Sequence, residues 1–200
     1  QALETKDFKV YYPNNNGREG LYNNLTALVF KAFGASTVAL KLVAVLAGIL
    51  GVIALYLLGK EMFNWQIGAL ASFLMAISFW HVNFSRISFR AILAPMLATY
   101  ALYFFWKGLK GKHLFNFLLS GIFIGLGFYT YIAFRVSPLI IILGFWAYWH
   151  FTWKDFSGIE YTHIRYYLLR GIILLAVTAI LVALPLGIYY WSHPEDFLGR

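Results

Sequence analysis

The stretch VALKLVAVLAGILGVIALYLL, residues 38–58, decides the fold class. Its one charged residue is Lys41, close to the N-terminal end, where a long side chain can reach the lipid headgroups. A helix rises about 1.5 Å per residue, so roughly twenty apolar residues cross the hydrocarbon core of a bilayer. The stretch therefore predicts a transmembrane helix.

The whole chain shares this apolar character. Of its 200 residues, 61% are hydrophobic, 20% are aromatic and only 12% are charged. A soluble domain of this size needs more charge to cover its surface. We therefore expect an all-α, polytopic integral membrane protein.

Five further apolar segments are candidates for spanning helices. They cover residues 67–84, 91–106, 117–134, 138–153 and 171–191. With the first stretch they predict about six spans in a transmembrane domain of residues 38–191. Within it, the sequence GIFIG at residues 121–125 favours close packing of two helices, because glycine lets backbones approach.

The N-terminal segment, residues 1–37, is predicted to be an extracytoplasmic loop, and residues 192–200 the start of another. The sequence PNNNG at residues 13–17 is typical of a turn. Residues 21–33 follow, with Leu21, Leu25 and Leu28 at helical spacing. This segment is too short to span a bilayer, so it predicts an amphipathic helix that lies in the interface.

The charge balance favours lipid over nucleic acid as the anionic partner. Lys and Arg number 16 against 8 Asp and Glu, and they mostly stand at the ends of apolar runs. The chain has no cysteine, which excludes disulfides and thiolate metal sites. If six spans alternate, the two faces carry nearly equal numbers of Lys and Arg, so the positive-inside rule does not assign the orientation.

One of those predicted faces collects arginines. They are Arg18, Arg86, Arg90, Arg135 and Arg200. Arg86 and Arg90 stand four apart in SFWHVNFSRISFRAIL, residues 78–93, without an acid near them in sequence, and on one helix they would share a side. Arginine donors match phosphate oxygens. Two interpretations remain open: the side chains reach headgroups without a specific partner, or the set binds an anionic substrate.

Other polar residues are weaker candidates. His81 could bind metal or phosphate, although a hydrogen-bonded packing role is commoner. His193, Glu195 and Asp196 in HPED form a weak metal motif, and a solvated helix cap is the alternative. Glu19 is a carboxylate in a glycine-flanked turn. These residues do not define a set of metal ligands. They allow a divalent cation as a cofactor.

Several longer motifs carry a resemblance to a known family. They are residues 2–63, SFWHVNFSRISFRAI (78–92), GLGFYTYIAFRVSPL (125–139) and HPEDFLGR (193–200). In order and spacing, the chain resembles the polyprenyl-phosphate-sugar glycosyltransferases of the GT-C fold. It is most similar to the protein-mannosyltransferase and aminoarabinose-transferase group, glycosyltransferase family 39, in its prokaryotic branch. The resemblance covers essentially all 200 residues.

The resemblance implies a reaction and a set of site residues. A sugar would move from a polyprenyl-phosphate carrier to a protein, lipid or glycan acceptor at the extracytoplasmic face of a prokaryotic plasma membrane. The carrier phosphate would be stabilised electrostatically as the glycosidic bond breaks. The candidate substrate- and phosphate-binding residues are Arg18, Glu19, Arg86, Arg90 and Arg135; the weaker ones are His81, Tyr131, His193, Glu195 and Asp196.

The chain departs from the family pattern at two places. The family's catalytic Asp, usually in an Asp-Glu pair after the first span, would precede Ala2, and neither Glu4 nor Asp7 matches it. We therefore expect the catalytic Asp to lie upstream of Gln1, and we expect the chain as given to be inactive. REGL, residues 18–21, also replaces the commoner His-Pro-Pro-Leu-like sequence.

A different function class remains as the alternative. A transporter or lipid flippase would use the arginines to bind an anionic substrate during alternating access. It predicts internal repeats or broken helices in paired positions, and the sequence shows no internal repeat.

Overall fold

A computed structural model describes residues 8–13, 18–111, 113–152 and 159–198. This part is almost entirely helical, which confirms the all-α membrane class. One small hairpin was not predicted: β1 (Tyr11–Tyr12) pairs antiparallel with β2 (Arg18–Glu19), and Tyr11 stands opposite Glu19. The turn predicted at residues 13–17 lies mostly outside the described residues, as do Glu4, Asp7 and Arg200.

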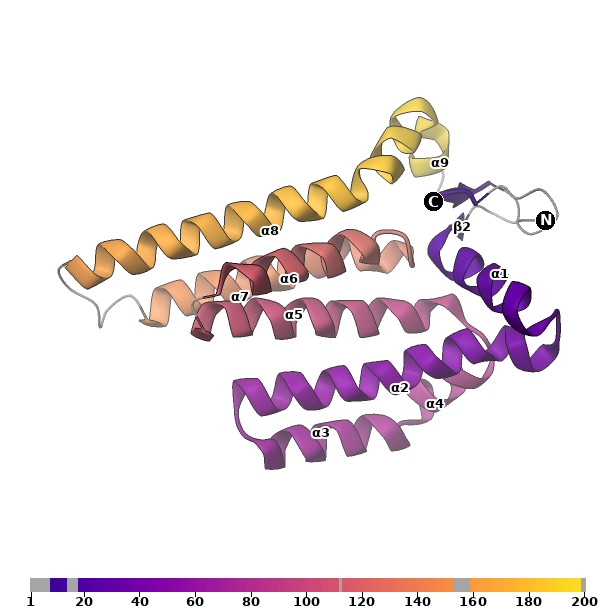
Figure 1. Cartoon of the computed structure of the whole chain (residues 1–200), viewed down its shortest axis with the longest axis horizontal. Coiled ribbons are helices and arrows are strands. Elements are labelled where there is room, and N and C mark those ends of the chain that lie inside the picture. The colour runs from indigo at the N-terminus through magenta and orange to yellow at the C-terminus, as the bar shows by residue number, and fades with distance from the viewer. Residues whose placement is uncertain (1–7, 14–17, 112, 153–158, 199–200) are drawn as a thin grey trace.

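The helices follow one another with short connections (Figure 1). Their bounds are α1 (Leu21–Phe33), α2 (Thr37–Met62), α3 (Trp65–Ile77), α4 (Phe79–Arg86), η1 (Arg90–Ile92), α5 (Leu93–Gly111), α6 (Leu114–Gly127), η2 (Ile132–Val136), α7 (Ser137–Thr152), α8 (Ile159–Ser192) and α9 (Pro194–Leu198). The predicted helix at residues 21–33 is thus confirmed as a helix with those bounds. Its place in the interface stays a prediction.

The predicted count of six spans is not confirmed. By length and composition, three helices of the described residues can cross a membrane: Thr37–Met62, Arg90–Gly111 and Tyr166–Ser192. The pair α3 and α4 adds a fourth span if it is taken as one helix bent by 58°. The segments Leu114–Gly127 and Ile132–Trp146 are shorter apolar helices. The hydropathy of a segment reflects its apolar composition and not whether it forms one continuous helix. The span predicted at residues 117–134 therefore ran past the end of α6.

Side-chain caps start both helices of the α2–α3 hairpin. Ser36 caps the N-terminus of α2, where its hydroxyl accepts a hydrogen bond from the Ala39 N–H at 3.1 Å. Asn64 caps α3 at the hairpin turn, accepting from the Ile67 N–H at 2.9 Å. Such caps satisfy N–H groups that have no partner within the helix. The chain therefore reverses within a few residues, and α3 returns along α2 (Figure 1).

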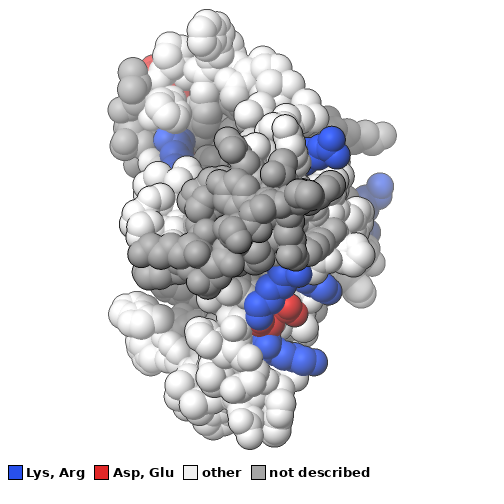
Figure 2. Space-filling view, turned by 90° about the vertical axis from the view of Figure 1, so that its left-hand side faces the viewer, with Lys and Arg blue, Asp and Glu red and all other residues white. Residues whose placement is uncertain are grey.

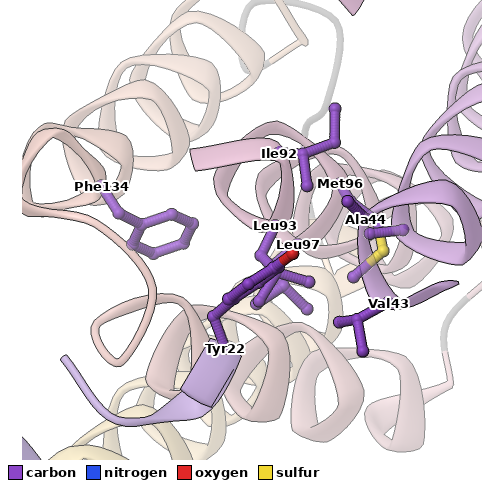
Figure 3. Packing of buried hydrophobic residues seen from close by; sticks show 9 residues of the cluster. Tyr22, Val43, Ala44, Ile92, Leu93, Met96, Leu97 and Phe134 are labelled. Carbon is purple, nitrogen blue, oxygen red and sulfur yellow. The ribbon is translucent and has the colours of Figure 1, made fainter. Parts of the chain in front are cut away.

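The helices form a layered bundle in which α2 packs on α3 and α5, α5 on α6, and α6 on α8. One core cluster joins α1, α2 and α5, with Tyr22 of α1 directed toward Leu93 and Leu97 of α5 (Figure 3). Phe134 of η2 belongs to the same cluster. This packing holds α1 and η2 at one end of the bundle.

Small residues bring α6 and α8 together. A Cβ added at Gly121 would lie 2.5 Å from the Leu175 carbonyl oxygen, and one at Gly125 would lie 2.5 Å from the Val182 Cβ. Only glycine permits these approaches without movement of α8. The close-packing prediction for residues 121–125 is therefore confirmed.

The hairpin and α1 form one connected unit. The Tyr12 hydroxyl donates to the Asn24 Oδ1 at 2.8 Å, and the Asn24 amide donates to the Lys9 carbonyl at 3.1 Å. A Cβ at Gly20 would overlap the Lys9 carbonyl oxygen, so glycine is required between β2 and α1. These contacts fix the position of Glu19, which directly precedes that glycine.

Candidate functional site

Most candidate residues lie at one end of the bundle. The hairpin, the start of α1, and α9 are at this end, on the right of Figure 1. The candidates there come from segments far apart in sequence, namely β2, η1, η2 and the α8–α9 corner. We call this region the arginine end.

Glu19 and Arg90 form an ion pair at this end. The Arg90 Nη1 donates to the Glu19 Oε2 at 3.2 Å, and the Glu19 side chain is only 1% exposed. Arg90 also lies over the Tyr131 ring, 5.6 Å from its centroid. A buried carboxylate requires a charged or hydrogen-bonded partner. No acid stands near Arg90 in the sequence, and its partner comes instead from β2, 71 residues earlier in the chain.

The backbone separates Arg86 from Arg90. Helix α4 ends at Arg86, Ser88 adopts the left-handed conformation with φ 58°, and Arg90 begins η1. A non-glycine residue with positive φ does not continue a helix. The prediction that the two arginines share one helix side is therefore wrong. Arg86 is exposed, and the described residues give it no ion pair or hydrogen bond.

Arg135 lies among aromatic rings. Its Nη2 donates to the Tyr190 hydroxyl at 3.2 Å, and its guanidinium lies 5.3 Å from the Tyr190 centroid and 4.5 Å from that of Phe197. Cations over aromatic faces are attracted by the ring quadrupole. These contacts hold Arg135 of η2 against the α8–α9 corner.

Tyr11 connects the two arginine pairs. It is 2% exposed and stands opposite Glu19 in the hairpin. Its ring centroid lies 5.0 Å from that of Tyr189 and 5.5 Å from that of Tyr190. The Glu19–Arg90 pair and the Arg135–Tyr190 pair therefore belong to one continuous site. Sequence reasoning missed Tyr11 and Tyr190, because aromatic residues are too common in this chain to stand out.

The side chains of His193 and Asp196 both contact Tyr189 of α8. Asp196 accepts from the Tyr189 hydroxyl at 2.8 Å. The His193 ring stacks on Tyr189 with centroids 4.6 Å apart, and Glu195 is exposed. Within the described residues, no group of three or more His, Asp or Glu side chains is arranged to hold a metal ion.

His81 and Arg18 lie apart from these contacts. The His81 Nε2 is 3.1 Å from the Gly48 carbonyl oxygen, where α4 packs on α2. This contact fits the hydrogen-bonded packing role that was one of the two interpretations of His81. Arg18 is exposed and stands opposite Tyr12 in the hairpin.

The sequence of this chain matches the family model described as dolichyl-phosphate-mannose-protein mannosyltransferase over residues 21–189. The chain belongs to this family. The resemblance to the GT-C mannosyltransferases is thus confirmed, and the protein is a membrane glycosyltransferase of the mannosyltransferase type. No curated protein and no solved structure matches the chain.

The described residues also form an apolar groove. It has a volume of about 660 Å³ and lies between α5, α6, α7 and α8. Its lining is apolar throughout and includes Phe105, Phe128, Ile141, Phe145, Leu175 and Ala183. It extends to Pro138 and Gly187, each three residues from Arg135 or Tyr190. The groove could not be predicted from sequence, because four helices contribute to it.

The opposite end of the bundle is also basic. Figure 2 shows Lys and Arg side chains around an acidic one on this end. The Lys110 Nζ donates to the Glu61 carbonyl at 2.7 Å and lies 5.9 Å from the Trp106 centroid. Lysines at helix ends can interact with anionic headgroups. Both ends of the described bundle thus carry basic side chains.

Proposed function

We propose that the protein transfers a mannosyl residue from a polyprenyl-phosphate carrier to a protein acceptor, at the membrane face where the arginine end lies. The observation that carries this proposal is the apolar groove that extends to Pro138, three residues along the chain from Arg135. A polyprenyl phosphate has the same two parts, a long apolar chain and an anionic end.

The groove suits the chain of the carrier. Its lining is almost purely apolar, and burial of apolar surface contributes roughly 25 cal/mol per Å². It runs between helices that are apolar enough to lie within the membrane, where the carrier itself is dissolved. The isoprenoid chain would therefore enter the groove from the lipid.

The arginines suit the phosphate of the carrier. When the bond between sugar and phosphate breaks, negative charge builds up on the phosphate, and fixed cations stabilise that charge. Tyr190 holds Arg135 and Glu19 holds Arg90. We assign Arg135 as the primary phosphate contact and Arg90 as a second, with the exposed Arg86 and Arg18 at the rim.

Transfer by the full-length protein in detergent tests the proposal. Labelled mannose on a polyprenyl phosphate would be followed to an acceptor peptide, with and without a chelator for the divalent cation. Arg135→Ala removes charge-assisted hydrogen bonds of about 1.5–3 kcal/mol each, so transfer should fall roughly ten- to a hundredfold. Arg170→Ala, an exposed arginine distant in sequence on the same helix as Tyr190, is the matched control. Equal activity of both variants would overturn the assignment.

Cysteine labelling tests the membrane face. The chain contains no cysteine, so Ser88→Cys and Lys110→Cys report on opposite ends of the bundle. If the arginine end is extracytoplasmic in a prokaryotic plasma membrane, an impermeant maleimide added to intact cells labels residue 88 and not residue 110. The reverse pattern would place the reaction on the cytoplasmic face.

A further inference from the structure

Helix α8 contains a proline in the turn that leads to the site. Pro185 lies inside α8 and cannot donate the N–H that would bond to the Leu181 carbonyl. Beyond it, the same helix carries Tyr189 and Tyr190, the residues that meet Tyr11 and Arg135. The direction of this last turn therefore depends on how the helix is held at the proline.

Tyr129 holds the helix at this point. Its hydroxyl donates to the Val182 carbonyl at 2.8 Å, and the Leu186 N–H donates to the same hydroxyl at 3.3 Å. Val182 and Leu186 are four apart, so they are the two partners of one regular helical hydrogen bond. A side chain inserted at such a bond is a known cause of helix bending. The hydroxyl thus supports α8 from the side.

The backbone of Tyr129 is fixed by two other elements. Its N–H donates to the Leu126 carbonyl at 3.1 Å, in the last turn of α6, and its carbonyl accepts from the Leu21 N–H at 3.2 Å. Leu21 begins α1, two residues after Glu19. One residue therefore connects the start of α1, the end of α6 and the proline turn of α8.

We propose that Tyr129 is a positioning residue, whose hydroxyl fixes the last turn of α8 so that Tyr190 meets Arg135. The phosphate site that Tyr129 positions is itself part of the proposed function, so this role rests on that proposal. The hydrogen bonds on Tyr129 themselves do not depend on that function. A Tyr129 that only fills space could be replaced by Phe, which keeps the ring and removes the hydroxyl.

Hydrogen exchange in the purified full-length protein gives a readout that does not require activity. In Tyr129→Phe, amides of residues 186–192 should exchange about tenfold faster, the factor that corresponds to one lost buried hydrogen bond. Amides of residues 44–54 in α2 should keep their rates and report that the bundle is folded. Tyr166→Phe, an exposed tyrosine far from Pro185 on the same helix, is the control and should change neither. Unchanged exchange in residues 186–192, or an equal rise in α2, would overturn the proposal.

A double-mutant cycle with Pro185→Ala separates positioning from packing. Alanine restores the missing N–H, so the helix needs the hydroxyl less, and Tyr129→Phe should then raise exchange by less than half as much. In the transfer assay, Tyr129→Phe should raise the KM for the lipid donor more than it lowers kcat, because Arg135 would lose its partner. Faster exchange with unchanged donor kinetics would show that the hydroxyl does not position the site. If the wild-type protein transfers no mannose, the proposed function fails, and the exchange cycle still decides whether the hydroxyl fixes α8.

Discussion

The guanidinium of Arg90 lies 3.2 Å from the carboxylate of Glu19, although the two residues are 71 positions apart. This pair joins β2, which precedes α1, to η1, which precedes α5, across the end of the bundle. Arg86, only four residues from Arg90, is exposed and lies on the other side of a helix break. The two arginines, which look equivalent in the sequence, therefore have different roles.

The first prediction separates these roles by stability. Arg90→Ala leaves the Glu19 carboxylate buried without this partner and should lower the free energy of unfolding by about 3 kcal/mol. Arg86→Ala should change it by less than about 0.5 kcal/mol, because the side chain is exposed. Thermal unfolding in detergent measures both. If Arg90→Ala lowered the free energy of unfolding as little as Arg86→Ala does, the ion pair would contribute little to the fold.

A second prediction concerns Arg86 in transfer. If its guanidinium contacts the carrier phosphate, Arg86→Ala should slow transfer roughly tenfold, without loss of stability. Arg86→Lys should restore the rate only in part, because an ammonium lacks the planar pair of donors. A normal rate in Arg86→Ala would instead indicate a side chain that only reaches the headgroups.

The close approach of α6 and α8 gives a third prediction. In Gly125→Ala the new Cβ would lie 2.5 Å from the Val182 Cβ and 2.9 Å from the Ala179 carbonyl oxygen. Overpacking of this kind costs about 1–3 kcal/mol of stability. Gly187→Ala places its Cβ in open space and should be neutral or stabilise the protein, since alanine favours helix. Unfolding midpoints that shift equally would contradict the packing interpretation.

A fourth prediction concerns the hydroxyl of Tyr22. Burial raises the pKa of this hydroxyl, and the Ser88 side chain offsets part of the rise. The Ser88 side chain lies close enough to affect the pKa but not in the distance and angle range of a hydrogen bond, and no other atom of the described residues bonds to the Tyr22 hydroxyl. Tyr22→Phe should therefore be neutral or stabilise the protein by up to about 1 kcal/mol. Tyr12→Phe, which loses the hydrogen bond to Asn24, should instead destabilise it by about 1 kcal/mol.

The groove gives a fifth prediction, on donor length. Ala183→Trp fills part of the lining and should exclude about two methylene groups of the carrier. The affinity for a long polyprenyl donor should then fall roughly tenfold, while a short-chain donor is unaffected. Val177→Trp is the control, because Val177 is exposed on α8 but outside the groove. Equal effects on both donors would argue that the chain binds elsewhere.

Features that depend on local composition could be predicted from the sequence. Apolar length predicted the membrane class, and helical spacing gave the bounds of α1. The glycine pair at residues 121 and 125 predicted close helix packing, which α8 provides. The motifs along the chain pointed to the family that the comparison then showed. Each of these features depends on residues that are close together in the chain. The spacing of apolar residues, the length of an apolar segment and the position of small side chains are all properties of a single helix.

The assembly of the site depends on the tertiary fold and could not be predicted from the sequence. The fold paired Arg90 with Glu19, ended α4 between Arg86 and Arg90, and inserted the Tyr129 hydroxyl at the proline turn of α8. It also ended α6 at Gly127 and bent α3 into α4, so the predicted count of six spans is not confirmed. These outcomes depend on contacts between segments that are distant in sequence. A buried charge, or a backbone group that lacks its helical partner, needs a hydrogen-bond partner from the residues packed against it. The local sequence does not show which residues those are.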